Sequence, residues 1–285
     1  MQLEGRRKSS NVEDRRRSSG AMVGGGIGLG GIIIIALYML FGGNPSDLEG
    51  MLGGMEGSAQ TGEYVETEQD KELFDFASTI LAGTEDVWTE IFKRNNLTYV
   101  PPKLVIFNGS VQSGCGGATS QSGPFYCSAD QSVYLDLSFF KSMKQQLGAD
   151  GDFAWAYVIA HEVGHHVQYL LGTLTEVNNK RQRVSEKEAN QLTVRLELQA
   201  DFYAGIWAYY DNKNYKSLEE GDIEEGLNCA SKIGDDYLQK KAYGRTVPDS
   251  FTHGTSAQRS KWLKKGLTTG NPALGDTFSP KYSEL

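Results

Sequence analysis

The sequence is poor in cysteine and histidine, with three cysteines and four histidines among 285 residues. It contains no CxxC pair, which argues against a structural zinc site built on cysteine. It also has no glycine-rich phosphate loop, no internal repeat and no basic patch beyond its first 20 residues. These absences disfavour nucleotide-binding folds, repeat architectures and a nucleic-acid-binding domain.

The two ends of the chain differ in charge. Residues 1–20 hold six basic and three acidic residues, a net charge of +3, and because the whole chain carries −8 the remainder carries −11. Residues 21–41 contain no charged residue, and about 20 apolar residues suffice to span a bilayer. We therefore predict one N-terminal transmembrane helix at 21–41. By the positive-inside rule, residues 1–20 would form a basic cytoplasmic tail and the acidic remainder would lie outside.

A cleavable secretory signal is the alternative for this segment. Its apolar run would be shorter, and the residues after position 41 match a cleavage site poorly. Residues 42–69 are rich in Gly, Ser, Glu and Gln, a composition that predicts a flexible linker. The chain is thus expected in the cell membrane as a single-pass protein, with an ordered domain at 70–285.

The pattern within residues 70–285 predicts an α+β domain. Alternating apolar residues at 132–137, and the mostly apolar segment 103–107, indicate two strands. From residue 151 onward the apolar residues recur at helical spacing. The domain is therefore expected to be mainly helical, with a small sheet.

Two of the three cysteines suggest an oxidising compartment. Cys115 and Cys127 bracket a loop rich in Gly and Ser, where a disulfide would contribute about 3 kcal/mol by restricting the unfolded chain. Disulfides persist outside the cytoplasm, in agreement with export of the domain. Cys229 is left over and is expected to be a buried thiol on a helix.

The pentapeptide at 161–165 carries the main chemical signal. His161 and His165 are four residues apart, so in a helix both imidazoles lie on one face and can bind one zinc ion. Glu162 lies about 100° around the helix, beside the position of a zinc-bound water, where a general base is needed. Gly164 would cost about 1 kcal/mol relative to Ala in a helix, which indicates a close approach of a ligand or of another backbone. His166 points away and is not expected to be a ligand.

A catalytic zinc ion usually has three protein ligands. Glu197 and Asp201 are again four residues apart, in a helical pattern from about 185 to 210. Glu197 can supply a carboxylate ligand, and Asp201 can accept the N–H of a ligating histidine. The alternatives for the third ligand are Asp201 itself, Glu176, Glu186 and Glu188.

These residues resemble the gluzincin peptidases, in which HExxH is followed by a helix carrying ExxxD. The resemblance implies a zincin-like domain with Glu197 as the third ligand of one Zn²⁺ ion and Asp201 as the partner of His161. It also implies that a strand before the active-site helix pairs with the extended substrate, and residues 132–137 are our candidate. His253, followed by Arg259, resembles a C-terminal element of HtpX-like membrane gluzincins. That likeness implies that His253 helps to stabilise the oxyanion and that Arg259 supports it.

Longer stretches resemble the YpfJ-type neutral zinc metallopeptidases over nearly the whole chain. The stretches are GPFYCSADQSVYLDLSFF (123–140), GDFAWAYVIAHEVGHHVQ (151–168), RLELQADFYAGIWA (195–208), GDIEEGLNCASKIGDD (221–236) and VPDSFTHGTSAQR (247–259).

The sequence therefore predicts a membrane-anchored zinc metallopeptidase that cleaves a peptide or protein substrate, with Glu162 as general base. Two alternatives stay open: a zinc-binding membrane adaptor without catalysis, and a zinc amidase acting on a non-protein amide.

Overall fold

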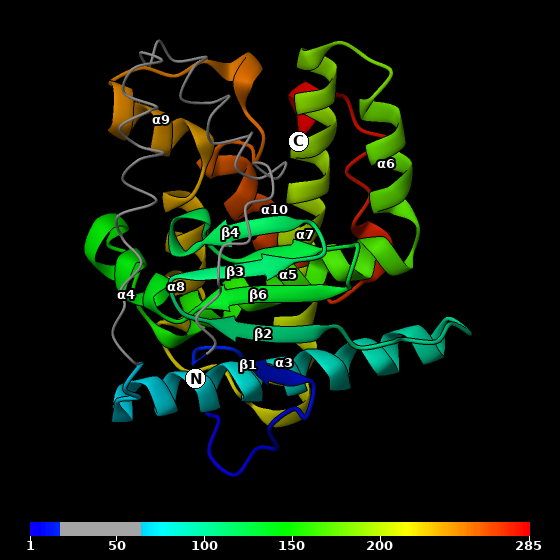
Figure 1. The fold of residues 1–285 in the computed structure, drawn as a ribbon. Helices are drawn as coiled ribbons and strands as arrows, with labels where there is room; N and C mark the ends of the chain where they lie inside the picture. The colour runs from blue at the N-terminus through cyan, green and yellow to red at the C-terminus, as the bar shows by residue number, and fades with distance from the viewer. Residues whose placement is uncertain (18–63) are drawn as a thin grey trace.

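The computed structural model describes residues 1–17 and 64–285 (Figure 1). This part of the chain forms a four-stranded sheet, a two-stranded sheet and a larger group of helices, which confirms the expected α+β class. The strands are β1 (Val12–Asp14), β2 (Lys103–Phe107), β3 (Ser110–Ser113), β4 (Gly116–Thr119), β5 (Phe125–Cys127) and β6 (Ser132–Asp136). The helices are α3 (Glu68–Arg94), α4 (Ser138–Ser142), α5 (Asp152–Leu170), α6 (Thr173–Arg181), α7 (Glu186–Tyr215), α8 (Asp222–Lys232), α9 (Asp235–Tyr243) and α10 (Ser256–Thr269).

The larger sheet has the strand order β1-β2-β6-β5. Strand β2 is parallel to both of its neighbours, and β5 runs antiparallel to β6. Alternate residues of β2 and β6 enter two different cores, because one face of the sheet packs on the helices and the other lies under the β3–β4 hairpin. Burial on both faces explains why residues 104–107 are continuously apolar.

The strand order corrects the expectation for residues 132–137. This segment forms β6, whose two edges are already paired with β2 and β5. It therefore has no free edge for a substrate, and β5 is the edge strand on that side of the sheet.

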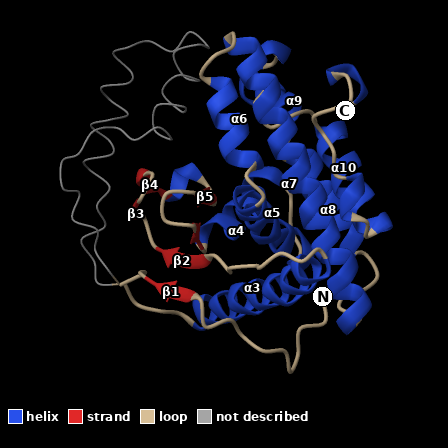
Figure 2. Ribbon diagram, turned by 90° about the vertical axis from the view of Figure 1, so that its right-hand side faces the viewer, coloured by secondary structure: helices blue, strands red, loops and turns tan. Residues whose placement is uncertain are grey.

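The helices pack around α5 and α7, with the sheet to one side (Figure 2). Helix α7 also packs against α10 at very short range, because Gly205 and Gly266 leave no side chain between the two backbones. A Cβ atom at Gly266 would lie only 2.1 Å from the carbonyl oxygen of Phe202. The core is thus continuous from α5 through α7 to α10.

Residues 1–17 belong to the same folded unit, contrary to the prediction of a separate tail at 1–20. Strand β1 extends the sheet beside β2, and Arg6 forms an ion pair with Asp211 of α7. The prediction treated these basic residues as a cytoplasmic tail beside a membrane, whereas Arg6, Arg7 and Lys8 form ion pairs with acidic side chains of α3 and α7.

The predicted membrane span at 21–41 and most of the predicted linker at 42–69 lie outside the described residues. Helix α3 begins at Glu68, two residues before the expected start of the domain, with a capping box between Thr67 and Asp70. Across residues 1–17 and 64–285, no helix is both long and apolar enough to cross a membrane.

Candidate metal centre

Helix α5 carries the HExxH pentapeptide through the middle of the core. Its run from Phe153 to Ala160 is almost wholly buried, and the helix ends at Leu170 before Gly172, which adopts a left-handed conformation (φ 82°). Gly151 occupies the N-cap position of α5, and no side chain caps this end of the helix. His161 and His165 share one face, with ring centroids 4.8 Å apart.

Helix α7 supplies the carboxylates. It begins with a capping box between Ser185 and Glu188 and crosses α5 where Gly164 meets Ala200. A Cβ atom at Gly164 would lie 3.0 Å from the carbonyl oxygen of Ala200. The glycine within the pentapeptide therefore allows α7 to bring Glu197 over the two histidines.

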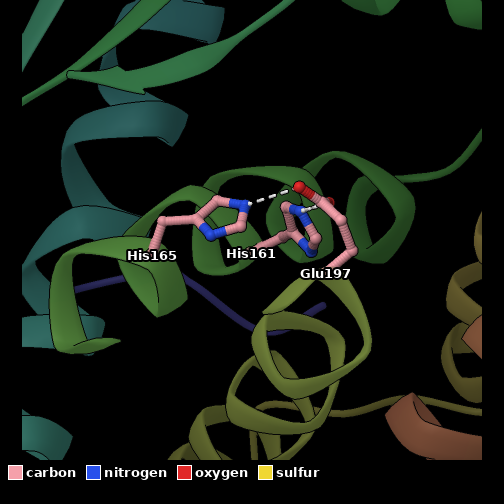
Figure 3. A group of neighbouring side chains, drawn as sticks. All are labelled: His161, His165 and Glu197. Atoms are coloured by element: carbon pink, nitrogen blue, oxygen red, sulfur yellow. Dashed lines mark hydrogen bonds and ion pairs between the residues drawn. The ribbon is translucent and has the colours of Figure 1, made fainter. Parts of the chain in front are cut away.

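The side chains of His161, His165 and Glu197 converge on one point (Figure 3). The Nε2 atom of His161 lies 3.1 Å from Oε2 of Glu197, and Nε2 of His165 lies 3.4 Å from Oε1. One potential ligand atom from each residue lies within 4.8 Å of the other two. Two imidazole nitrogens and one carboxylate form a donor set that suits Zn²⁺.

Asp201 fixes the orientation of His161. Its Oδ1 atom lies 2.8 Å from Nδ1 of His161 and also accepts the hydroxyl of Tyr157 at 2.5 Å. Because Nδ1–H donates to this carboxylate, the lone pair of Nε2 is directed toward Glu197. Arg259, for which the resemblance implied a supporting role, is buried against Asp201 and donates to both of its carboxylate oxygens at 2.9 Å.

Gln168 fixes the orientation of His165, a contact that the sequence analysis missed. Its Oε1 atom lies 2.9 Å from Nδ1 of His165, so Nε2 of this ring is also free to face Glu197. The Gln168 amide donates to the carbonyl of Leu196 and to Gln199, which in turn donates to the carbonyl of Gly275. The only sign of this contact in the sequence is that Gln168 follows His165 by three positions in a helix, and such pairs are common.

The electrostatics of the site favour a cation. Burial alone would lower the pKa of His161, but the charges and hydrogen bonds of Asp201 and Glu197 outweigh it and raise that pKa to about 10. Glu197 likewise outweighs burial and raises the pKa of His165. Burial opposes ionisation of Asp201, yet Arg259 and His161 lower its pKa to about 2. The two carboxylates thus stay charged, and a bound cation would satisfy Glu197.

Glu162 lies beside this group without a hydrogen bond. It is buried, and in the described ranges no side chain or backbone group donates to its carboxylate. Burial raises the pKa of Glu162, while the nearby histidines oppose that rise. A carboxylate whose neutral form is favoured in this way can accept a proton readily.

His253 lies on the loop before α10 and is held there by Asp235. The carboxylate Oδ2 of Asp235 accepts the backbone N–H groups of Thr252, His253 and Gly254, at 2.7, 2.6 and 3.0 Å. Its Oδ1 atom lies 3.4 Å from Nδ1 of the His253 ring, whose side chain is half exposed. Partial burial of the ring lowers the pKa of His253, but the charge of Glu197 and the hydrogen bond and charge of Asp235 outweigh this and raise it. No motif in the sequence marks Asp235 as the partner of this loop.

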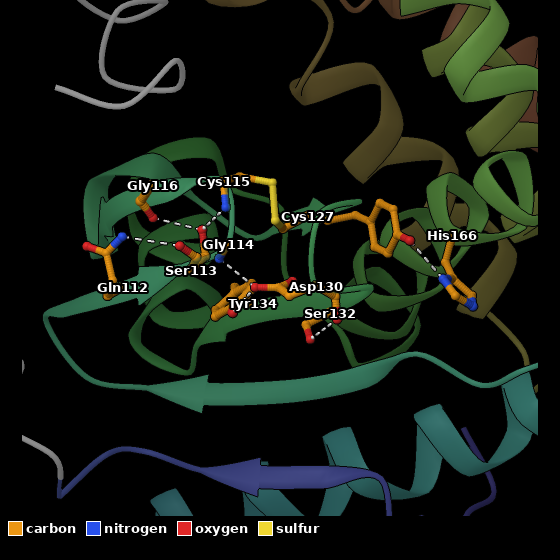
Figure 4. Close-up of a disulfide and its surroundings, with 11 residues drawn as sticks. Gln112, Ser113, Gly114, Cys115, Gly116, Cys127, Asp130, Ser132, Tyr134 and His166 are labelled. Atoms are coloured by element: carbon orange, nitrogen blue, oxygen red, sulfur yellow. Dashed lines mark hydrogen bonds between the residues drawn. A yellow bond between two sulfur atoms is a disulfide. The ribbon is translucent and has the colours of Figure 1, made fainter. Parts of the chain in front are cut away.

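His166 does not join the group, as the sequence predicted. Its Nε2–H donates to the carbonyl of Val100 at 2.7 Å, and its Nδ1 accepts the hydroxyl of Tyr126 at 2.9 Å (Figure 4). Burial lowers the pKa of His166, which keeps the ring neutral. Tyr126 directly precedes Cys127, which forms a disulfide with Cys115. Cys229 is a buried free thiol, as expected.

The alternative third ligands lie elsewhere. Glu176 and Glu186 are exposed, Glu188 caps α7, and Asp201 is occupied by His161, Tyr157 and Arg259. A second possible cluster in the described residues contains only carboxylates, from Asp152, Asp222 and Glu225. It already has a positive neighbour, since the α-amino group of Met1 lies 3.5 Å from Asp222.

The comparison with known proteins agrees with a zinc-binding site. A family model described as "Putative neutral zinc metallopeptidase" matches residues 1–278. The chain belongs to the neutral zinc metallopeptidase family. The resemblance to the YpfJ-type neutral zinc metallopeptidases is therefore confirmed.

Two relatives show how widely this family likeness extends. The Escherichia coli K12 protein YpfJ is 49% identical over 284 residues, covering 98% of this chain and 99% of its own length. The Mycobacterium bovis protein Mb2605 is 44% identical over 191 residues, covering 64% of each chain. Both are named as uncharacterized proteins, so they support the family relationship but supply no known activity. No solved structure matches this chain.

Proposed function

We propose that this member of the family is a peptidase that uses one zinc ion to hydrolyse peptide bonds. One observation carries the proposal: the Nε2 atoms of His161 and His165 both face Glu197, and each ring is fixed through its Nδ1 atom. A structural role alone would not require Glu162, a buried carboxylate without a hydrogen bond in the described ranges, beside those three groups.

The residues present fit zinc. His161 and His165 would hold it through Nε2 and Glu197 through its carboxylate, which is one anionic and two neutral donors. When bound, zinc supplies a Lewis acid that polarises a carbonyl and lowers the pKa of a water molecule.

The protein's own groups perform the proton transfers. Glu162 takes a proton from the attacking water and delivers it to the leaving amine, as its raised pKa favours. His253, which Asp235 holds near the site, donates to the developing oxyanion. Asp201 and Gln168 keep the two ligand rings in the tautomer that leaves Nε2 free.

We further propose that residues 21–41 keep the protein at a membrane, with its domain in an oxidising compartment. The absence of charge from that segment supports the first statement, and the disulfide between Cys115 and Cys127 supports the second. Recovery of the full-length chain with the membrane fraction is expected. Recovery in the soluble fraction after cell lysis would contradict membrane attachment.

The variant Glu162→Gln tests the proposed chemistry. It keeps the shape of the side chain but cannot accept the proton, so hydrolysis of casein should fall by at least about 100-fold while one zinc ion stays bound. Glu176→Gln is the matched control, because Glu176 is exposed on α6 and should retain both activity and zinc. Full activity in Glu162→Gln would exclude the proposed role of this carboxylate.

A further inference from the structure

The first 17 residues make a built interface with the domain. Strand β1 pairs with β2 in parallel, with Val12 opposite Leu104 and Asp14 opposite Ile106. The backbone N–H of Leu104 donates to the carbonyl of Asn11, and that of Arg15 donates to the carbonyl of Ile106, at 2.9 and 2.7 Å. Without β1, the edge of β2 would expose these groups.

A buried ion pair lies at the centre of this interface. The guanidinium of Arg6 donates to both oxygens of Asp211 at 2.9 and 2.6 Å, and the Asp211 side chain is fully buried. Gly83 of α3 leaves the room for this pair, since a Cβ atom there would lie 2.8 Å from both Arg6 and Asp211. Three separate parts of the chain therefore fit one another at this point.

A second buried acid depends on the same segment. Glu85 of α3 accepts the hydroxyl of Ser9 at 2.6 Å and the side-chain amide of Asn11 at 2.8 Å. It also lies 2.9 Å from the guanidinium of Arg7. If residues 1–17 left the domain, both Glu85 and Asp211 would lose these partners inside the protein, which is strongly unfavourable for a buried charge.

The described residues that flank positions 18–63 meet at one place. The guanidinium of Arg16 lies 3.1 Å from the hydroxyl of Tyr64 and 2.7 Å from the carboxylate of Glu66. It also lies over the ring of Phe74, 4.9 Å from its centroid. The described residues on either side of the interval are thus in direct contact.

We infer that residues 1–17 and the catalytic domain lie on the same side of any membrane to which the protein is attached. A single crossing within residues 21–41 would separate Arg16 from Glu66 by a hydrocarbon layer of about 30 Å, which is incompatible with their ion pair. The basic segment is therefore an integral part of the domain and not a tail on the opposite side of the membrane. This inference is independent of the proposed zinc chemistry.

Lys8 and Asp75 offer a direct test, because they form an ion pair at 2.6 Å and both side chains are about half exposed. Lys8→Cys and Asp75→Cys would be introduced singly and together into the full-length protein. Membrane vesicles of known orientation would then be treated with a membrane-impermeant maleimide. The unsubstituted protein is the control for background, since its cysteines are either in a disulfide or buried.

Both positions should be labelled from the same face of intact vesicles, and detergent should not be needed to expose either one. In the double variant, a short bismaleimide should join residues 8 and 75 within one chain, as seen by mass spectrometry of the linked peptides. Labelling of the two positions from opposite faces, without a cross-link, would overturn the inference and restore a single crossing. Neither readout depends on peptidase activity, so failure here leaves the proposed function untouched.

Discussion

Replacement of Gln168 by leucine should weaken zinc binding without removing a ligand. Gln168 is fully buried, and its Oε1 atom is the acceptor that holds Nδ1–H of His165 at 2.9 Å. Loss of such an orienting partner typically lowers metal affinity by 10–100-fold, or about 1.4–2.7 kcal/mol. The same change leaves the carbonyl of Leu196 and the amide oxygen of Gln199 without this donor, at a cost of about 1–3 kcal/mol per unpaired buried group.

Gln168→Glu separates these two effects. A carboxylate still accepts the proton on Nδ1 of His165, so zinc affinity should stay at or above that of the unsubstituted protein. It cannot donate to Leu196 or Gln199, so the free energy of unfolding of the metal-free protein should still fall. A structural role alone would lower stability in both variants and leave zinc affinity unchanged in both.

Competition with a chromophoric chelator measures the zinc affinity, and urea denaturation of the metal-free protein measures the stability. Gln182→Leu is the matched control, because Gln182 is exposed at the end of α6. If Gln168→Leu binds zinc as tightly as this control, then Gln168 does not orient His165 toward a metal.

Two other changes test the surroundings of the site. Asp235→Asn should destabilise the protein by about 2–3 kcal/mol at neutral pH, since it removes the charge that accepts three backbone N–H groups. Burial raises the pKa of Asp235, but the hydrogen bond and charge of His253 outweigh the effect of burial and hold that pKa below 3.8. The stabilisation by the Asp235 carboxylate is therefore present above pH 3.8 and is lost as the pH falls further. Urea denaturation at several pH values should therefore show the difference between the two proteins narrowing below that pH, and a constant difference would refute the assignment. Arg6→Met should lower the free energy of unfolding by about 3–5 kcal/mol because it leaves Asp211 buried without its partner, whereas Arg6→Met with Asp211→Leu should lose much less. Equal losses in the single and double variants would show that the ion pair is not formed.

The convergence of the two histidines and Glu197 could be expected from the sequence because it depends on local geometry. Each pair of residues four apart lies on one helix face, and the apolar residues around both pairs place those faces in the core. Gly164 also indicated a close contact, and the crossing of α5 and α7 lies at that residue.

The roles of Gln168, Asp235 and Arg259 could not be read in the same way. Asp235 approaches His253 only because α9 begins beside the loop that precedes α10, and that arrangement is tertiary. A supporting role for Arg259 was implied only by the resemblance, because its partner Asp201 lies 58 residues away in the sequence.

Strand pairing was the other part that the sequence left undetermined. Strand β1 has only three residues and pairs with a strand about 90 positions later, so no local turn signal marks it. The charge of residues 1–17 was a real feature of the sequence, but charge alone does not distinguish a lipid headgroup from Asp211 or Glu85 as its counterpart.

The central claim is that one zinc ion is held by His161, His165 and Glu197, and a crystal structure with zinc, phased at the zinc absorption edge, tests it most directly. We expect a single anomalous peak per chain, within bonding distance of both Nε2 atoms and of the Glu197 carboxylate. A peak at Asp152, Asp222 and Glu225 instead, or no peak between the two histidines at saturating zinc, would contradict the account.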